Sequence, residues 1–268
     1  LKKTLGLTDL WIKDEGKNPT ASFKDRASAI VVARAREINA EIVVTASTGN
    51  AGAGLAGVAA AIGQKCIIFA PKTAPPAKVA QLLVYGAQVI LVDGNYDSAF
   101  DLTIEASKEF GWYCRNTGFN PFTAEGKKTA AFEIWEQILV SLPEESKPLY
   151  VFVSVGDGNI ISGLHKGFQD LYRLGWLTQM PRLFGVQSSG SAAVAHAVFA
   201  GTDVITPVSA RNDEGTRSKQ GPGLRKDARD AGLAARRRRR AGRGGRSERL
   251  TSPAGGGQPD RLRPACSP

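Results

Sequence analysis

The sequence predicts an α/β protein in which parallel strands are covered by helices. Three observations indicate this fold class. Short β-branched and apolar runs alternate with stretches of helical periodicity over residues 1–210. Gly or Pro stands at many of the junctions between them. Hydrophobic residues make up 42% of the chain, enough to bury a core. Strands that alternate with helices are typical of a parallel sheet, because each crossover must return the chain to the starting edge.

Each expected element rests on its own local signal. Apolar and β-branched runs predict the strands, and apolar residues at helical spacing predict the helices. Gly63, Gly86 and Gly111 follow three of the helices and predict their ends. In chain order we expect a strand at 10–13, a helix at 22–39, a strand at 41–45, a helix at 51–62, a strand at 66–69, a helix at 77–85, a strand at 88–92, helices at 96–110 and 123–139, a buried strand at 149–155, a helix at 160–174 and a strand at 183–187.

The net charge of +10 is unevenly distributed. Residues 211–268 hold 16 Lys and Arg against 6 Asp and Glu, whereas the residues before them are balanced. This segment is rich in Arg, Gly, Ala and Pro, and we expect it to be a disordered basic tail. The arginine run at 236–240 could serve as a nucleic-acid patch. A solvated charge run without a role is the better interpretation, because a shift of reading frame near Ala210 would produce this composition. Nucleic acid is therefore not the partner that we expect.

Other features exclude further classes. The apolar runs are too short to span a membrane, and no secretion leader is visible, so we expect a cytoplasmic protein. The three cysteines form no CxxC pair, and we expect no metal site. His165 and His196 stand alone. The expected partners are a small-molecule substrate and, among proteins, a second copy of the chain.

Lys24 is the first candidate for chemistry. It stands just inside a predicted helix, after a Pro-Thr-Ser turn and Phe23. The positive end of the helix dipole favours the neutral amine, which Schiff-base chemistry requires. An ordinary surface lysine before a helix is an equally good interpretation of the spacing alone.

Two polar turns that join a strand to a helix are the next candidates. Ser47-Thr48-Gly49-Asn50 offers hydroxyl and N–H groups for a carboxylate or a phosphate, although these groups could simply cap the helix. Gly156-Asp157-Gly158-Asn159-Ile160 could direct successive N–H groups at an anion. Asp157 would repel a phosphate unless its carboxylate points away.

A third glycine pattern has a different interpretation. Gly52, Gly54 and Gly57 match the dinucleotide pattern G-x-G-x-x-G. They fall inside a predicted helix, however, and the next strand ends without an acidic residue for a ribose. Tight packing of this helix against the sheet is the better explanation.

Together these motifs resemble the pyridoxal-phosphate enzymes of the tryptophan-synthase-β fold type, and among them the threonine synthases most. The resemblance covers about residues 8–209. It rests on the following segments: Lys13-Asp14-Glu15-Gly16, Asn18-Pro19-Thr20, Ser22-Phe23-Lys24-Asp25-Arg26, Ser47-Thr48-Gly49-Asn50-Ala51-Gly52, Asn120-Pro121, Glu125-Gly126-Lys127-Lys128-Thr129 and Gly156-Asp157-Gly158-Asn159-Ile160.

The resemblance implies two interleaved open parallel-sheet domains and pyridoxal 5'-phosphate as cofactor. The larger domain would comprise residues 1–40 and 116–210, and the smaller, mobile domain residues 41–115. Site roles are implied as follows: Lys24 would bind the cofactor covalently and transfer protons, Asn50 would bond the cofactor's ring hydroxyl, Gly156, Asp157, Gly158, Asn159 and Ile160 would hold its phosphate, Ser47 and Thr48 would hold the substrate's carboxylate or phosphate, and Asn116 and Thr117 would bind the substrate's phosphate.

The implied reaction converts O-phosphohomoserine and water to threonine and phosphate. Two departures qualify it. Thr123 stands where threonine synthases often carry an arginine for the substrate's phosphate, and the residue that faces the pyridine nitrogen would fall after Ala210. We therefore expect weak or no activity from the chain as written. A serine/threonine dehydratase, a β-replacement enzyme and a non-catalytic truncated product are the alternatives.

Overall fold

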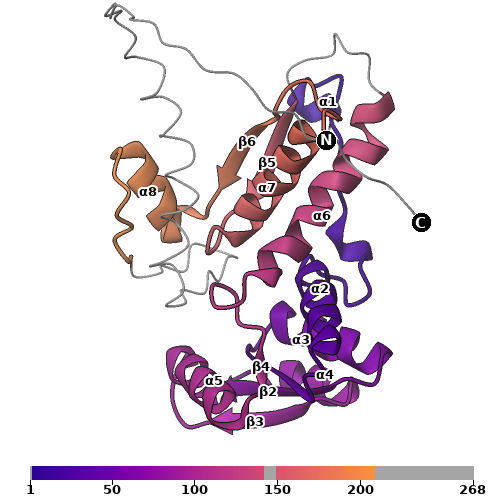
Figure 1. Cartoon of the computed structure of the whole chain (residues 1–268). Coiled ribbons are helices and arrows are strands. Elements are labelled where there is room, and N and C mark those ends of the chain that lie inside the picture. Colours follow the sequence, from indigo (N-terminus) through magenta and orange to yellow (C-terminus); the bar gives the residue numbers. More distant parts are fainter. Residues whose placement is uncertain (1, 142–148, 209–268) are drawn as a thin grey trace, which may run out of the picture.

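The computed structural model describes residues 2–141 and 149–208, and it has the predicted α/β fold with parallel strands (Figure 1). A four-stranded sheet has the order β3-β2-β1-β4, and a two-stranded sheet pairs β5 with β6. Every described strand pair is parallel. The strands are β1 (Ile42–Ala46), β2 (Lys65–Pro71), β3 (Gln88–Val92), β4 (Tyr113–Cys114), β5 (Tyr150–Ser154) and β6 (Arg182–Val186).

The helices agree with the sequence pattern at most positions. The described helices are α1 (Lys2–Leu5), α2 (Lys24–Glu37), α3 (Asn50–Ala61), α4 (Pro76–Val84), α5 (Tyr96–Phe110), α6 (Phe122–Gln137), α7 (Asn159–Arg173) and α8 (Ala193–Phe199), with short 3-10 turns at Glu15–Lys17, Leu139–Ser141 and Ser189–Ser191. Gly63, Gly86 and Gly111 have φ values of 68°, 79° and 67°, as expected for glycines that end helices. The predictions of these helix ends are confirmed.

Four elements differ from the prediction, apart from the short 3-10 turns. Residues 10–13 form no strand, because they pair with no other strand in the described ranges, and Trp11 and Ile12 are exposed. The two-residue strand β4 was too short to give a periodic signal, yet it pairs with β1. Helices α1 and α8 were also missed.

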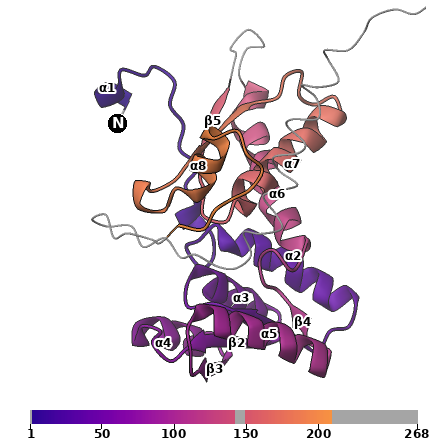
Figure 2. The same ribbon diagram turned by 90° about the vertical axis from the view of Figure 1, so that its left-hand side faces the viewer.

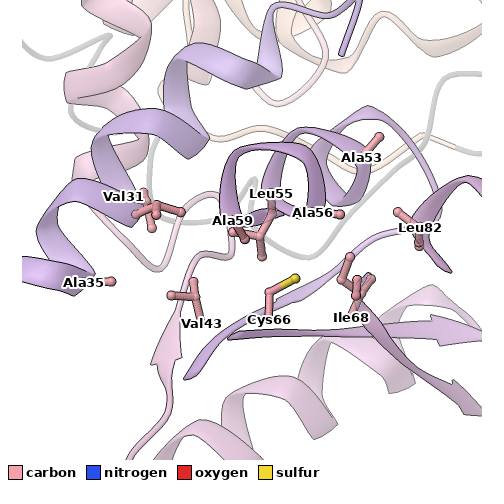
Figure 3. Packing of buried hydrophobic residues seen from close by; sticks show 12 residues of the cluster. Val31, Ala35, Val43, Ala53, Leu55, Ala56, Ala59, Cys66, Ile68 and Leu82 are labelled. Atoms are coloured by element: carbon pink, nitrogen blue, oxygen red, sulfur yellow. The ribbon is translucent and has the colours of Figure 1, made fainter. Parts of the chain in front are cut away.

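The four-stranded sheet is packed on both faces. Val43, Cys66 and Ile68 point toward α2 and α3, where Figure 3 shows them against small side chains of α3. Val44 and Ile67 point the other way, into a cluster with α5. This alternation follows from the period of two along each strand, and the continuous apolar runs are what a sheet covered on both sides requires.

Among the described residues, the sheet of β5 and β6 is covered on one face. Val153 is buried against α6 and α7. On the other face Phe152 is 69% exposed and its ring stacks on Phe184, which is 42% exposed. The prediction of a buried strand at 149–155 is therefore wrong for one of its faces, because β5 pairs only with β6 among the described strands and Phe152 stays exposed.

Helices α2 and α6 connect the two sheets. Helix α2 packs against α3 on one side and α6 on the other, and α6 packs against α7 (Figure 2). The approach is close because glycines stand at the crossings. A Cβ atom on Gly126 of α6 would lie 2.2 Å from the carbonyl oxygen of Arg26 in α2, and one on Gly167 of α7 would lie 2.5 Å from the carbonyl oxygen of Lys128.

An ion cluster tightens the same junction. The Nε and Nη2 groups of Arg26 donate to the carboxylate of Glu15 at 2.7 and 2.9 Å. Its Nη1 and Nη2 groups donate to Glu133 of α6 at 2.7 and 2.8 Å, and Nη1 also donates to Thr129. The hydrogen bonds from Arg26 and Lys13 lower the pKa of Glu133 to about 2, against the penalty of burial. The sequence motif around Glu15 thus fixes the N-terminal segment onto α2 and α6.

Some expectations concern residues that the structure does not describe. The basic tail, the reading-frame hypothesis at Ala210 and the residue for the pyridine nitrogen lie outside the described residues, as does Cys266. Among the described residues, no helix has the length and apolarity needed to cross a membrane, and no three His, Cys, Asp or Glu side chains gather as metal ligands.

Candidate functional site

The predicted site residues gather where the strands end. Arg115 and Asp157, which follow β4 and β5 at their carboxyl ends, act by their charges on Lys24 at the N-terminus of α2. The same two charges act on Tyr96, the first residue of α5, whose hydroxyl donates to the carbonyl of Ala46 at the end of β1. This edge is where open parallel sheets bind ligands, because loops that leave the strands there can converge.

Lys24 is the first residue of α2. Its backbone N–H donates to the hydroxyl of Ser22 at 3.0 Å, which satisfies one donor at the helix start. The side chain is partly buried. Burial lowers the pKa of Lys24, the charge of Asp157 opposes this effect, and the charge of Arg115 adds to it. A neutral amine is therefore available at lower pH than for an ordinary lysine.

The glycines of α3 bring that helix close to Lys24. A Cβ atom on Gly54 would lie 2.9 Å from Oδ1 of Asp25 and 3.2 Å from the carbonyl carbon of Lys24, and one on Gly57 would lie 2.4 Å from the methyl group of Thr20. The glycines do allow close packing, but their partner is not the sheet that we expected: Gly54 lies against the first residues of α2, and Gly57 lies against Thr20 in the turn before them. Both carboxylate oxygens of Asp25 accept hydrogen bonds from Thr20.

Ser47, Thr48 and Asn50 lie between β1 and α3. The Ser47 hydroxyl is buried and accepts a hydrogen bond from the Gly49 N–H at 3.1 Å. Gly49 is the residue that caps α3, and its cap has no side-chain hydrogen bond. The hydroxyl therefore stabilises the turn itself, which is not the capping role considered for this motif. Asn50 begins α3 and is exposed.

Asn116 and Thr117 follow β4. The side-chain oxygen of Asn116 accepts hydrogen bonds from the Ala46 N–H at 2.7 Å and the Thr45 hydroxyl at 3.0 Å, so it joins the ends of β1 and β4. The Nδ2 group of Asn116 is buried and has no hydrogen-bond partner among the described residues. Thr117 is partly buried, and its hydroxyl accepts from Nη1 of Arg115 at 3.4 Å.

The loop between β5 and α7 is open around its two glycines. Gly158 has a φ of 81° and caps α7, and a Cβ atom on Gly156 or Gly158 would meet no atom within 4 Å. Asp157 turns its Oδ1 onto the N–H of Asn159 at 3.0 Å. The side-chain oxygen of Asn159 also accepts a hydrogen bond from Lys127, a fully buried lysine of α6.

Arg115 and Tyr96 are the functional candidates that sequence reasoning missed. Arg115 is 1% exposed, and its charge acts on Lys24 and on Tyr96. Burial lowers the pKa of Arg115 to about 10, against the charges of Tyr96, Asp157, Cys114 and Asp25. Burial also raises the pKa of Tyr96, whose hydroxyl donates to the carbonyl of Ala46 at 3.3 Å. In the sequence Arg115 follows Trp112, Tyr113 and Cys114, a run too short to predict a strand, so no sequence signal marked it.

Thr123 is fully buried at the start of α6. Its hydroxyl donates to the carbonyl oxygen of Asn120 at 2.8 Å. Thr123 thus closes a helix turn and brings no charge to the site.

These residues fit pyridoxal phosphate. Lys24 offers a partly buried amine whose pKa is lowered, which suits a covalent link to an aldehyde. The open glycine loop at the start of the 15-residue helix α7 can accept a phosphate at a helix N-terminus. The N–H of Asn159 in this loop donates to Oδ1 of Asp157, whose charge also acts on Lys24.

Comparison with known proteins agrees with this site. The family model described as pyridoxal-phosphate dependent enzyme matches residues 1–240. A threonine synthase of Methanocaldococcus jannaschii is 41% identical over 198 residues, which are 74% of this chain and 47% of that protein. A threonine synthase of Methanosarcina acetivorans is 35% identical over 77% of this chain and 50% of its own length.

A solved structure has a similar fold. The processed form of threonine deaminase isoform 2 from Solanum lycopersicum matches with a TM-score of 0.63 and 25% identity, over 75% of this chain and 52% of that one. The chain spans about half the length of the curated relatives that it matches. The match over most of its residues leads to one conclusion: the chain belongs to the family of pyridoxal-phosphate dependent enzymes, with pyridoxal phosphate as its cofactor.

Proposed function

We propose that this chain carries the active site of a threonine synthase, a lyase that converts O-phosphohomoserine and water to threonine and phosphate. The observation that carries the proposal is Lys24 at the N-terminus of α2, partly buried and with a lowered pKa. The threonine synthases that are 35–41% identical to this chain support the choice of reaction. When bound, pyridoxal phosphate supplies an electron sink for the substrate's α-carbon.

The chain's own residues would share the remaining work. Lys24 would hold the cofactor through its amine and, once free, would take the proton from the substrate's α-carbon and then one from the β-carbon. Phosphate would leave from the γ-carbon, and the hydroxyl of water would add at the β-carbon. The two protons would return to the γ-carbon and the α-carbon, and the remaining proton of the water would go to the released phosphate. Ser47 and Thr48 would orient the substrate's carboxylate at the end of β1, and Asn50 would bond the cofactor's ring hydroxyl.

The remaining groups would hold the two phosphates. The loop from Gly156 to Ile160 would bind the cofactor's phosphate through its backbone N–H groups. Asn116 and Thr117 would face the substrate's phosphate. We further propose that residues 41–115, which contain the whole four-stranded sheet, form the smaller domain, and that residues 1–40 and 116–210 form the larger one.

An absorbance titration tests the cofactor and its lysine. We expect the 268-residue chain to develop the visible band of lysine-bound pyridoxal phosphate, and Lys24→Ala to lose it. The exposed Lys17, seven positions earlier, provides the matched control Lys17→Ala, which should keep the band. A band of equal intensity in Lys24→Ala would show that another amine binds the cofactor.

Product analysis tests the reaction. Release of phosphate from O-phosphohomoserine together with threonine formation supports the proposal. Formation of 2-oxobutanoate from threonine would instead support a serine/threonine dehydratase. That second candidate is favoured by the uncharged Thr123 and by the similarity to a threonine deaminase structure. The two assays use the same purified protein, so one preparation decides between them.

A further inference from the structure

The site holds a buried cation that its own neighbours do not satisfy. Arg115 is 1% exposed, and its Nε and Nη2 groups have no hydrogen-bond partner within the described residues. Its one side-chain hydrogen bond in the structure is the long contact from Nη1 to the Thr117 hydroxyl, at 3.4 Å. Buried polar groups are nearly always hydrogen-bonded, and a buried charge is normally paired, so this guanidinium requires an explanation.

The nearby acids do not provide the missing partner. Asp157, Asp25 and the Tyr96 hydroxyl act on Arg115 only through their charges. The carboxylate of Asp25 accepts from Thr20 with both oxygens, and Oδ1 of Asp157 accepts from Asn159. The Tyr96 hydroxyl donates to Ala46.

The two unpaired nitrogen atoms of Arg115 form a fork, a geometry that arginines use to bind anions. Nε and Nη2 lie on one edge of a guanidinium and can bind two oxygens of one anion side by side. Arg26 of the same chain uses these two atoms for the carboxylate of Glu15. Asn116, the next residue, adds a third buried donor without a partner, its Nδ2 group. A phosphate ester, with three terminal oxygens and up to two negative charges, can satisfy more of these donors than a carboxylate can.

The fork also lies within the active site. Arg115 follows β4 at the carboxyl end of the four-stranded sheet, where β1 also ends. Its charge acts on Lys24, and the charge of Asp157, which follows β5 of the second sheet, acts on Arg115. The backbone N–H of Arg115 donates to the carbonyl of Val44 at 2.7 Å, so the strand fixes the residue in place. The cofactor's phosphate has a separate cradle in the loop that begins at Gly156.

We propose that Arg115, with Nδ2 of Asn116, is the residue that selects a phosphorylated substrate by holding its phosphate in the buried guanidinium fork. This inference rests on the proposed function and deepens it, because it names the cation that the uncharged Thr123 does not supply. It assigns Arg115 to substrate binding and leaves the proton transfers to Lys24.

The proposal is tested by measuring how inorganic phosphate binds to the 268-residue chain that has been saturated with pyridoxal phosphate. Acetate serves as the carboxylate probe. We expect phosphate to raise the melting temperature of the parent and to bind more tightly than acetate. Arg115→Met should weaken phosphate binding at least about tenfold, the scale of one lost bidentate charge-assisted contact. Arg36→Met, which removes an exposed arginine of α2, is the matched control and should bind phosphate like the parent.

The variant should remain folded. Replacing a buried, unpaired charge by an apolar side chain of similar size is often neutral or stabilising, so Arg115→Met without phosphate should melt no lower than the parent. Arg115→Lys provides a second variant that keeps a charge and loses the fork, and it should also bind phosphate weakly. Phosphate binding by Arg115→Met within about twofold of the parent, or no phosphate binding by the parent, would overturn the proposal.

Two further measurements show whether the fork binds the phosphate of the cofactor or of the substrate, and whether a failure concerns this inference or the proposed function. Absorbance titration of the parent and of Arg115→Met with pyridoxal phosphate and with pyridoxal, which lacks the phosphate, tests the source of the anion. Removal of the Arg115 charge should change the affinity for both aldehydes by a similar factor, through the pKa of Lys24. A loss confined to pyridoxal phosphate would assign the fork to the cofactor's phosphate instead. If phosphate binding follows the expectation but O-phosphohomoserine is not converted, the subsite stands and the proposed reaction fails. If O-phosphohomoserine is converted and its KM is unchanged in Arg115→Met, the reaction stands and this inference fails.

Discussion

The lysine that would bind the cofactor has a basicity set by three identifiable causes. Burial of Lys24 disfavours its charged form and lowers its pKa, Asp157 counteracts this, and Arg115 reinforces it. The amine is partly exposed, so it can both react and be tuned by its neighbours. A residue that is an ordinary lysine by composition thus becomes a nucleophile through its position.

Removal of a positive charge at one neighbour and of a negative charge at another should therefore shift the pKa of Lys24 in opposite directions. Arg115→Met removes a cation and should raise the pKa of Lys24, whereas Asp157→Asn removes an anion and should lower it. The rate at which an amine reagent labels Lys24, followed against pH by mass spectrometry without cofactor, measures both shifts. The exposed Lys72–Asp93 pair offers the control Asp93→Asn, which should leave the profile unchanged. Shifts of the same sign in the two site variants would contradict this assignment of causes.

At the scale of elements, β5 shows how one strand can have two different faces. Val153 packs into the cluster formed with α6 and α7, while Phe152 lies on the open face. The apolar run predicted burial on both faces, but burial of a strand depends on what covers it, and the run itself carries no information about that.

This asymmetry predicts that truncating the smaller side chain, Val153, destabilises the fold more than truncating the larger one, Phe152. Val153→Ala should lower the free energy of unfolding by about 1–3 kcal/mol, because it leaves a cavity in a buried cluster. Phe152→Ala removes a larger side chain, but it loses mainly one ring contact with Phe184, worth about 0.5–1.5 kcal/mol. Urea denaturation of the two variants measures the difference. A greater loss from Phe152→Ala would mean that the open face is covered in solution.

For the whole molecule, the junction of α2 with α6 determines how the two sheets are held. Lys24 begins α2, and the loop at Gly156 leads into α7, which packs on α6. The relative position of the lysine and the phosphate loop therefore depends on this junction, and Arg26 fixes it with its bonds to Glu15 and Glu133.

A methyl group at the crossing should disturb stability and site together. In Gly126→Ala the new carbon would lie 2.2 Å from the carbonyl oxygen of Arg26, so the helices must separate. We expect a loss of about 1–3 kcal/mol or more in the free energy of unfolding, together with weaker cofactor binding. Ala29→Ser adds one atom on the exposed side of α2 and should change neither quantity appreciably. An unchanged midpoint in Gly126→Ala would show that the two helices can separate without cost.

The sequence by itself determined the local elements and the candidate lysine. Strands and helices carry their own periodicity, and the glycines that end helices or open the loop before α7 act through their own backbone conformation. Lys24, Asn116 and the glycine loop could be found because each belongs to a short motif. The two-residue strand β4 could not, since its existence depends on pairing with β1.

Only the tertiary structure decided what surrounds these residues. Arg115 resembles a surface arginine in the sequence, and its burial results from the meeting of segments that begin α2 and α5 and end β4 and β5. The unpaired guanidinium edge, the lowered pKa of Lys24 and the open face of β5 are likewise properties of contacts between distant segments. Burial and charge interactions depend on distances in space, and a linear pattern records those distances only within one turn or one strand.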